Sequence, residues 1–293
     1  MRSDRAADIF VCPRCRGRLT AGESGFDCAD HGHFPLWNAT PCFAGATEFD
    51  NHWLSNGPAE IPHAKKVVAR AFLEPARQML ADVPSVRILD CGCGDGVHAS
   101  VLMEGGGLDV AASYGVDLAR EAVFLASRRA IPGWRFFQGD LQGLPLPECH
   151  FDLAFAFGVV EYTSDPAQAV AELCRVVRPG GVVGLWMLPK PSGVTGVALS
   201  VLRRLAQLSG AWGARLIADG VVPFLSFVPN KSGLSLRNAS WQQCREAVLV
   251  NLSPRHLYFG ETETVIGWLR RNGVTPVHID RANPVTVWGR RDS

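Results

Sequence analysis

The chain has 293 residues, 47% of them hydrophobic and 19% charged, and a formal net charge of +1 at pH 7. This composition excludes an intrinsically disordered chain. The near-zero charge excludes a general attraction for nucleic acid, so RNA binding would need a local basic patch. A chain of this length holds one large domain and a small accessory module.

Neither the N-terminus nor the longest apolar stretch has the pattern of an export or membrane signal. The first eight residues lack the apolar run of a secretion signal, so we expect a cytoplasmic protein. The stretch Val182–Leu202 is interrupted by Pro189, Lys190 and Pro191, which makes it a poor membrane span. The nine cysteines lie in unlike settings, which favours thiols and a metal site over a disulfide framework.

Four N-terminal residues have the spacing of a metal site. Cys12 and Cys15 form a C-x2-C pair, and after twelve residues Cys28 and His31 form a C-x2-H pair. Each pair can supply two ligands from a tight turn to one shared ion, and the three thiolates with the one imidazole complete a closed tetrahedral Zn²⁺ site. His33 is a second candidate for the fourth ligand. The alternative is a small hairpin with unligated thiols.

Residues 1–45 contain little that forms a core. Their glycines and short polar runs predict a knuckle and a hairpin, so something other than burial must hold the segment together. Zinc would supply that stabilisation, because metal binding contributes directly to the folding of small modules. We therefore predict that the Zn²⁺ is structural.

Strands and helices alternate along the rest of the chain. Pro62–Leu80 has helical spacing of its apolar residues, and Pro75 is predicted to divide it into two helices. Beyond it, apolar runs alternate with helical patterns at Ala119–Ala130 and Pro166–Val177, which predicts a doubly wound parallel sheet. The predicted strands are Val86–Asp90, a run ending at Tyr114–Asp117, Trp134–Asp140, Phe151–Phe157 and Gly181–Met187, followed by a hairpin of Val274–Asp280 and Val285–Trp288.

The end of the first strand carries ligand chemistry. In a parallel sheet, ligands bind at the carboxyl ends of the strands. Asp90 precedes a loop in which Gly92 and Gly94 allow a tight turn and close backbone approach. A helix begins near Val97 and points its amides at the site. A carboxylate at Asp90 would repel a pyrophosphate but can pair with an ammonium group or orient water toward it.

The next strand ends add two more acids. Asp117 can accept hydrogen bonds from both hydroxyls of a ribose, and Asp140 can accept one from an adenine amino group. Leu118 and Leu141 supply apolar walls for the ring, and Phe157, at the end of the fourth strand, is expected in the same pocket. S-adenosylmethionine (SAM) has an ammonium group, a ribose and an adenine but no phosphate. The three acids therefore predict SAM as the cofactor.

Six segments in this order resemble the class I SAM-dependent methyltransferases. The resemblance covers about Val86–Leu188 and, more weakly, the C-terminal hairpin. It implies a Rossmann-like α/β fold whose seven-stranded, mostly parallel sheet has the order 3-2-1-4-5-7-6, with the last strand antiparallel and helices on both faces. It also implies methyl transfer from SAM. The matching segments are Ile88–Gly96, Gly115–Ala119, Gly139–Pro145, Phe151–Phe155, Val160–Tyr162 with Asp165–Pro166, and Arg175–Gly181.

The chain departs from the family at one position after the fourth strand. Where the family often has Glu-His, this chain has Glu161 and Tyr162, so no catalytic role is carried over to Tyr162. A general base is needed only when the acceptor atom is poorly ionised. Glu161, His256 and Tyr258 are the candidates for that role, and the sequence assigns it to none of them.

Two further likenesses concern the N-terminal third. The cysteine-bearing module resembles the zinc ribbons that precede some methyltransferase domains, including those of the 23S ribosomal RNA guanine-N1 methyltransferases. Phe49–Trp53 resembles the linker of bacterial methyltransferases with a ribbon-like head that act on small molecules or cell-surface glycans. We expect a zinc-ribbon-like module at residues 1–45, a helical linker or lid at 46–85, and a methyltransferase domain at 86–293.

The methyltransferase domain has an insertion at residues 190–253, which is longer than a crossover needs. It contains five more basic than acidic residues, and its apolar residues recur at helical spacing. A basic, apolar lid suits an acidic or phosphate-linked lipophilic substrate, or peripheral contact with a membrane surface. The alternative is a helical cap packed on the core.

These features together predict a function and leave two alternatives open. We expect SAM-dependent methyl transfer to a small-molecule, glycan or lipid-linked acceptor. The first alternative is an rRNA (guanine-N1) base methyltransferase with RNA as its partner. The second is a non-catalytic adaptor that retains the SAM-binding fold and acts through its zinc ribbon. No motif indicates an oligomeric state.

Overall fold

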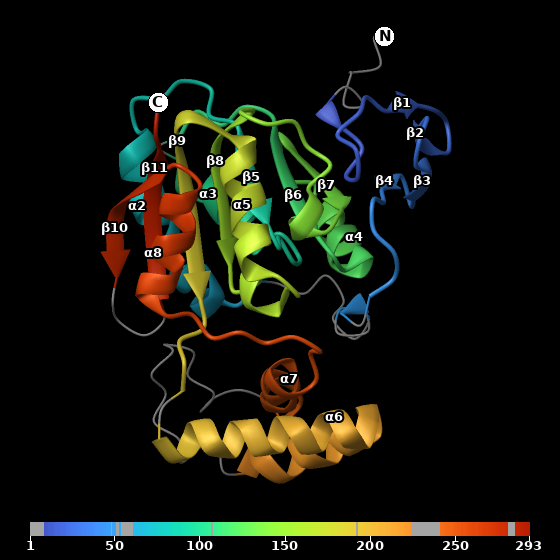
Figure 1. The fold of residues 1–293 in the computed structure, drawn as a ribbon, viewed down its shortest axis with the longest axis vertical. Coiled ribbons are helices and arrows are strands. Elements are labelled where there is room, and N and C mark those ends of the chain that lie inside the picture. The colour runs from blue at the N-terminus through green and yellow to red at the C-terminus, as the bar shows by residue number, and fades with distance from the viewer. Residues whose placement is uncertain are drawn as a thin grey trace.

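In the computed structural model, the described residues form three parts, which Figure 1 shows together. A seven-stranded sheet with helices on both faces forms the body, and a four-stranded sheet lies beside one of its edges. Two helices, α6 (Gly193–Val221) and α7 (Trp241–Leu252), lie across the end where the parallel strands finish. The described residues are 9–47, 49–50, 53, 61–106, 108–191, 193–223, 241–280 and 285–293.

The large sheet has the order β10-β11-β9-β8-β5-β6-β7. Six strands run in the same direction, and β11 alone is reversed, since it is antiparallel to both of its neighbours, β9 and β10. This confirms the predicted order and the antiparallel last strand. The strands are β5 (Ile88–Cys91), β6 (Ser113–Asp117), β7 (Trp134–Gln138), β8 (Phe151–Phe157), β9 (Val177–Met187), β10 (Val274–Asp280) and β11 (Val285–Arg291).

Side chains alternate between two apolar clusters, one on each face of the sheet. Leu89 and Ala154 pack with one cluster, whereas their neighbours Ile88 and Leu153 pack with the other. This alternation follows from the two-residue period of a strand, and the continuous apolar run of β8 is typical of a strand that is covered on both faces. Helices α5 (Pro166–Val176) and α8 (Thr262–Arg271) cover the first face; α2 (His63–Leu80), α3 (Val97–Gly105) and α4 (Arg120–Arg128) cover the second.

The prediction that Pro75 divides the segment before the sheet into two helices was wrong. Helix α2 is continuous, with Pro75 in its interior. Proline removes one backbone hydrogen bond and favours a break. Here, however, Phe72 and Leu73 before the proline and Ala76 and Leu80 after it are all buried in one cluster, so packing holds both halves of the helix against the sheet.

The sequence suggested that the N-terminal module has little core of its own. In the structure its strands share the hydrophobic core of the body. Phe10 and Phe43 are buried beside Phe137 of β7, with ring centroids 5.1 Å and 6.2 Å away, and Phe26 lies 5.3 Å from Phe10. Aromatic pairs at these distances add to the free energy gained by burial. The strands of this module are β1 (Thr20–Ala21), β2 (Gly25–Cys28), β3 (Gly32–Trp37) and β4 (Thr40–Pro41).

Hydrogen bonds and an ion pair also join the module to the body. Phe43 N donates to Gln138 O of β7 at 3.0 Å, beside a parallel bridge between Cys42 and Gln138. Arg16 donates to Glu172 Oε2 of α5 at 2.7 Å and to Leu144 O. Because β7 is the last strand of the sheet, the module covers an edge that would otherwise present unpaired backbone groups.

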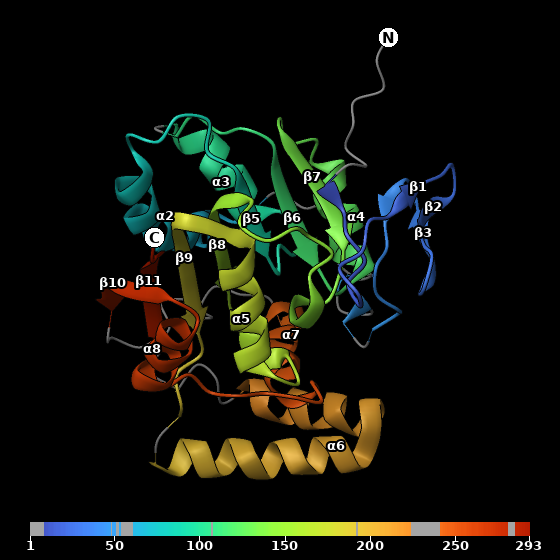
Figure 2. The ribbon, with the colours of Figure 1, turned by 45° about the horizontal axis from the view of Figure 1, so that its top comes forward.

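Two helices are described within the predicted insertion. Helix α6 (Gly193–Val221) contains Gly210 in a non-helical conformation, with φ 68° and ψ −170°, and Figure 2 shows the helix doubling back at its turn. Both parts pack against α7 (Trp241–Leu252) around a small apolar cluster. Residues 224–240 lie outside the described part of the chain. Among the described residues, no helix is long and apolar enough to span a membrane.

The shared aromatic core makes a testable prediction about stability. Replacing Phe10 with Ala should lower the free energy of unfolding by about 3 kcal/mol, because a buried ring that contacts four others is lost. Urea denaturation measures this change. Val277→Ala, at a position 59% exposed, is the matched control and should change the value by less than about 0.5 kcal/mol. Equal effects of the two substitutions would show that the module is not part of the core.

Candidate active site

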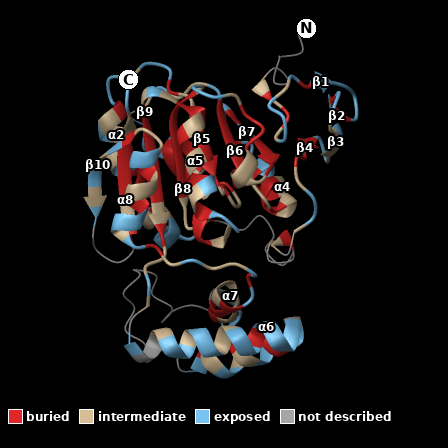
Figure 3. Cartoon of the chain, viewed as in Figure 1, coloured by how far each residue is buried: buried red, intermediate tan, exposed pale blue. Residues whose placement is uncertain are grey.

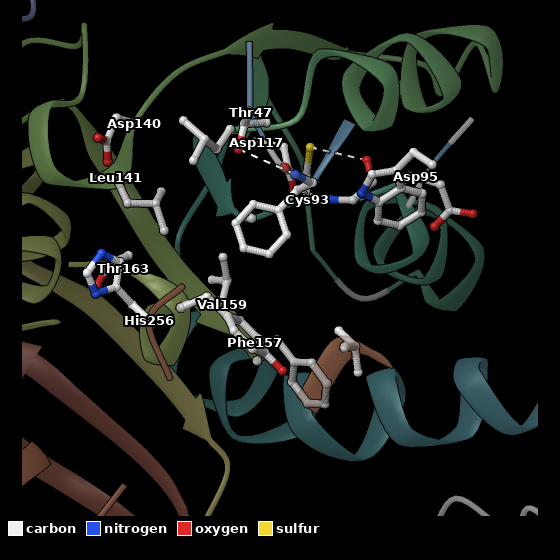
Figure 4. A pocket seen from close by; sticks show the side chains of 18 of the residues that line it. Thr47, Cys93, Asp95, Asp117, Asp140, Leu141, Phe157, Val159, Thr163 and His256 are labelled. Atoms are coloured by element: carbon white, nitrogen blue, oxygen red, sulfur yellow. Dashed lines mark hydrogen bonds between the residues drawn. The ribbon is translucent and has the colours of Figure 1, made fainter. Parts of the chain in front are cut away.

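A cavity of about 670 Å³ lies at the carboxyl ends of β5, β6, β7 and β8, and Figure 4 shows it from close by. Its volume falls in the range of sites that enclose a small ligand. Of the eight residues expected at a cofactor, all but Asp90 line it. These are Gly92, Gly94, Asp117, Leu118, Asp140, Leu141 and Phe157.

The loop between β5 and α3 needs its glycines for shape and for space. Gly92 and Gly94 have φ values of 78° and 52°, which disfavour any side chain. A Cβ atom on Gly92 would lie 2.6 Å from Val159, and one on Gly94 would lie 3.0 Å from Trp53. The backbone of the loop therefore packs directly against Val159 and Trp53, with no room for a side chain at either glycine. The loop forms one wall of the cavity.

Asp117 joins this loop to the end of β6. Its Oδ2 accepts a hydrogen bond from Gly94 N and its Oδ1 accepts one from Ala119 N, both at 2.9 Å. Burial raises the pKa of Asp117 to about 6, although the hydrogen bonds from Ala119 and Gly94 oppose the rise. The carboxyl group is therefore ionised at neutral pH, and each oxygen keeps a lone pair for a ligand hydroxyl.

Asp90 is fully buried in β5 and does not line the cavity. Neither carboxylate oxygen has a hydrogen-bond partner among the described residues. His98 Nδ1 lies 3.9 Å from Oδ2, but burial lowers the pKa of His98 to about 4, so this imidazole is neutral at neutral pH. Burial raises the pKa of Asp90 well above its usual value, and the charge of Asp117 adds to the rise. Buried polar groups are normally paired, so this carboxyl group fits a site that receives a cationic ligand or an ordered water.

The loops after β6 and β7 supply apolar walls with fixed positions. Asp140 accepts a hydrogen bond from Gln142 N at 2.9 Å and so caps the short 3-10 helix Leu141–Gly143. Gln138 Nε2 donates to Leu118 O at 2.9 Å and to Gly45 O at 2.8 Å. Sequence reasoning missed Gln138; an amide among the apolar residues that end β7 was the available signal.

The linker before α2 closes over the same cavity. Thr47, Phe49 and Trp53 all line it. Asp50 holds the linker in place, because its Oδ1 accepts from Arg120 N at 3.0 Å and its Oδ2 accepts from Thr47 N at 2.9 Å. The sequence predicted a helical linker or lid at 46–85 but named none of Thr47, Phe49 and Trp53 as a residue of the cofactor site.

Only one of the three candidate bases lines the cavity. His256, from the segment after α7, does so. Glu161 is fully buried elsewhere, its Oε1 accepts from Leu188 N at 3.2 Å, and burial raises its pKa to about 7. Tyr258 is 44% exposed and donates to Ser164 O at 3.2 Å. Of the three candidates, the geometry therefore leaves His256 as the one at the cavity. Its neighbour Arg255 lines the cavity as well.

A second group of side chains lies in the N-terminal module. One ligand atom from each of Cys12, Cys15, Cys28 and His31 lies within 4.8 Å of all the others. His31 Nδ1 is 3.6 Å from the sulfurs of Cys12 and Cys28, and the sulfurs of Cys15 and Cys28 are 3.7 Å apart. His33 is outside this group, because its Nδ1 is 2.8 Å from Asp27 Oδ1.

Comparison with known proteins identifies the family. Residues 89–185 match the methyltransferase domain family. Trans-aconitate 2-methyltransferase of Azoarcus sp. is 29% identical over 215 residues, which cover 69% of this chain and 74% of that protein. Malonyl-[acyl-carrier protein] O-methyltransferase of Enterobacter lignolyticus is 32% identical over 233 residues, which cover 79% of this chain and 78% of that protein. The chain belongs to the class I SAM-dependent methyltransferases.

A solved structure supports the fold of this methyltransferase. The match is a chain from the complex between the Haloferax volcanii Trm112 methyltransferase activator and a protein assigned as a methyltransferase. It has a TM-score of 0.53 at 15% identity, and the match covers 85% of this chain and 100% of that chain. At this identity the likeness concerns the fold alone.

The raised pKa of Asp117 predicts how SAM affinity of the methyltransferase depends on pH. Below about pH 6 the carboxyl group is protonated, so it loses acceptor capacity toward ligand hydroxyls. Calorimetry should therefore show SAM binding weakening as the pH is lowered from about 7.5 to about 5. Asp117→Asn should bind SAM roughly ten-fold more weakly at neutral pH, with a flatter pH profile, because a charge-assisted acceptor is lost. Wild-type affinity in this variant would contradict the assignment.

Proposed function

We propose that this methyltransferase methylates a carboxylate oxygen of an apolar acid, either a free small molecule or a lipid-linked acceptor. The observation that carries the proposal is the distribution of charge in the cavity. Its lining acids, Asp95, Asp117 and Asp140, lie at or just beyond the carboxyl ends of β5, β6 and β7, whereas α2 contributes Lys65 and the segment after α7 contributes Arg255 and His256. A guanidinium and an imidazole attract an acid and orient it.

The cofactor site is proposed from the residues that the cavity brings together. Asp117 would accept from the ribose hydroxyls, Asp140 from the adenine amino group, and Leu118 and Leu141 would flank the ring. The backbone of Gly92 and Gly94 would approach the ligand closely, and Phe157 would close the far wall. Asp90 would act on the ligand's ammonium group through an ordered water, since it lies behind the lining.

The chain's own residues have a positioning role in the reaction. Bound SAM supplies a methyl group on a positively charged sulfur, and transfer to an ionised carboxylate breaks the C–S bond, leaves the electron pair on sulfur and needs no proton acceptor. Arg255 would hold the acceptor carboxylate, and Phe157, stacked on Trp186 with ring centroids 4.3 Å apart, would exclude water. An acceptor of this class would need no base, so the buried Glu161 would have no catalytic role in the transfer.

Two relatives agree with an acidic acceptor, whereas another, the tRNA U34 carboxymethyltransferase of Methylococcus capsulatus, is named for tRNA. Trans-aconitate 2-methyltransferase and malonyl-[acyl-carrier protein] O-methyltransferase are both named for carboxylate-bearing substrates. The RNA alternative is less well supported, because Arg16, one of the arginines around the first cysteine pair, forms an ion pair with Glu172 within the molecule.

The bond that the enzyme forms can be identified by its chemistry. Incubation with methyl-labelled SAM and fractionated cell extract should place the label in an organic-soluble acid, and mild alkali should release it as methanol, because esters hydrolyse under conditions that leave ether, N-methyl and C-methyl groups intact. Arg255→Gln should keep its SAM affinity and lose most of the transfer. Label in RNA, or label that resists alkali, would contradict the proposal.

We also propose that residues 1–45 form a structural zinc module, residues 46–85 a linker over the cofactor, and residues 190–253 an insertion in the methyltransferase domain at 86–293. The fit of zinc to the module rests on distances. Tetrahedral geometry with bonds of about 2.3 Å to sulfur and 2.0–2.1 Å to nitrogen places two sulfurs about 3.8 Å apart and a sulfur and a nitrogen about 3.6 Å apart. The observed separations are 3.7 Å and 3.6 Å.

Two histidines provide a matched test of the zinc site. His31→Ala should lower the metal content well below one Zn²⁺ per chain, measured by inductively coupled plasma mass spectrometry, and should lower the melting temperature. His33→Ala should retain the metal, because His33 pairs with Asp27 instead. Loss of zinc from the His33 variant alone would show that the ligand assignment is wrong, and full metal content in both variants would exclude a histidine ligand.

A further inference from the structure

Helix α6 presents large apolar side chains to solvent. Val197, Val201 and Leu208 are 67%, 52% and 79% exposed, and Trp212, beyond the bend at Gly210, is 76% exposed. Val197 and Val201 are four residues apart and Leu208 follows after seven, so in the first part of the helix they lie on one face. Figure 3 shows exposed residues along α6.

This exposed face is not the face that packs on the molecule. The side of α6 that packs against α7 has Ala206, Ala214 and Ala218 buried at its centre, and larger apolar residues are partly buried around them: Leu199, Leu202, Ile217 and Val221. Ala206 lies nine residues after Val197 and five after Val201, which places it on the opposite side of the helix. An amphipathic helix normally turns its apolar stripe to the core and its polar stripe to water. Here both stripes are apolar, so the outer one is available to a partner.

The charges beside the outer stripe are positive. Arg204 lies three residues after Val201 and four before Leu208, and Arg215 lies three residues after Trp212; both are exposed. The only acid in α6, Asp219, is paired with Arg245 at 3.5 Å and also accepts from the indole of Trp241 at 3.3 Å. The surface therefore combines apolar side chains and exposed indoles with unneutralised positive charge.

We infer that the outer face of α6 docks on an anionic membrane surface. Leucine, valine and tryptophan side chains are favourable at the boundary between headgroups and acyl chains, and arginines beside them pair with lipid phosphates. A second copy of the chain is a poorer occupant, because a two-fold symmetric contact brings the same patch of both copies together and so juxtaposes their arginines.

Docking at α6 would bring the cavity to the membrane. Helix α6 packs on α7, and Val250 of α7 together with Arg255 and His256 just beyond it lines the cavity. A lipid-soluble acid could then enter from the membrane beside the residues that receive its carboxylate. This consequence rests on the proposed function, whereas docking itself does not, since it is measured without turnover.

Vesicle binding tests the inference. The full chain is sedimented with vesicles of phosphatidylcholine containing phosphatidylglycerol, and with vesicles of phosphatidylcholine alone. We expect binding to the anionic vesicles that weakens with salt. The double variant Leu208→Glu and Trp212→Glu should bind them at least about ten-fold less well, because two apolar anchors become acids. Arg204→Gln with Arg215→Gln should lose about five-fold in binding for each arginine removed.

Controls separate docking from other outcomes. Val277→Glu also replaces an exposed apolar side chain with an acid, but on β10 and away from α6, so this variant should bind vesicles like the wild type. All variants should keep their SAM affinity, which shows that they fold. Vesicle binding that is absent in the wild type, or equal in the Leu208/Trp212 variant, overturns the inference. If the Leu208/Trp212 variant bound vesicles like the wild type but formed smaller oligomers in analytical ultracentrifugation, the face would be assigned to contact with a second copy of the chain instead.

Discussion

The site depends on one carboxylate that serves two loops. Asp117 accepts hydrogen bonds from Gly94 N and Ala119 N, so it ties the glycine loop after β5 to the turn after β6. Because the two strands are parallel neighbours, their ends lie close enough for one side chain to reach both amides. Burying this charge raises its pKa to about 6, and the backbone hydrogen bonds keep it ionised at neutral pH.

The glycine loop is held from its other sides as well. Val159 lies against Gly92 and Trp53 against Gly94, so the residues after β8 and the linker both depend on the absence of a side chain there. The linker in turn is held by Asp50 and by Gln138, whose amide reaches Gly45 O and Leu118 O. The N-terminal module therefore belongs to the architecture of the site, because its aromatic packing on β7 positions the segment that leads to the linker.

The sequence predicted the features that local periodicity and spacing determine. The apolar runs located the strands of the large sheet, and the acids at successive strand ends located Asp117 and Asp140 at one cavity. The cysteine and histidine spacing predicted the four side chains that meet in the N-terminal module. Each of these features depends on residues close together in the chain or on the regular crossover of a parallel sheet.

The features that the sequence did not predict depend on contacts between distant segments. Asp90 was expected to pair with the ligand's ammonium group or to orient water toward it, and the sequence did not indicate which; the alternation of β5 places it with Ile88, on the side of the helix that carries His98 and behind the cavity lining. Pro75 was expected to end a helix that tertiary packing keeps intact. Arg255 and His256 reach the cavity from a segment with no motif of its own, so periodicity alone could not place Arg255 there or favour His256 over the other candidate bases. Gln138 lies behind the lining, where its amide joins Gly45 O to Leu118 O, a contact between distant segments that periodicity does not predict.

The most direct test of the central role of Asp117 is a crystal structure of the chain with S-adenosylhomocysteine. We expect the ligand in the cavity at the ends of β5 to β8, with its ribose hydroxyls within hydrogen-bond distance of Asp117 and its adenine between Leu118 and Leu141. A ligand bound elsewhere, or one that leaves Asp117 without a contact, would contradict that role.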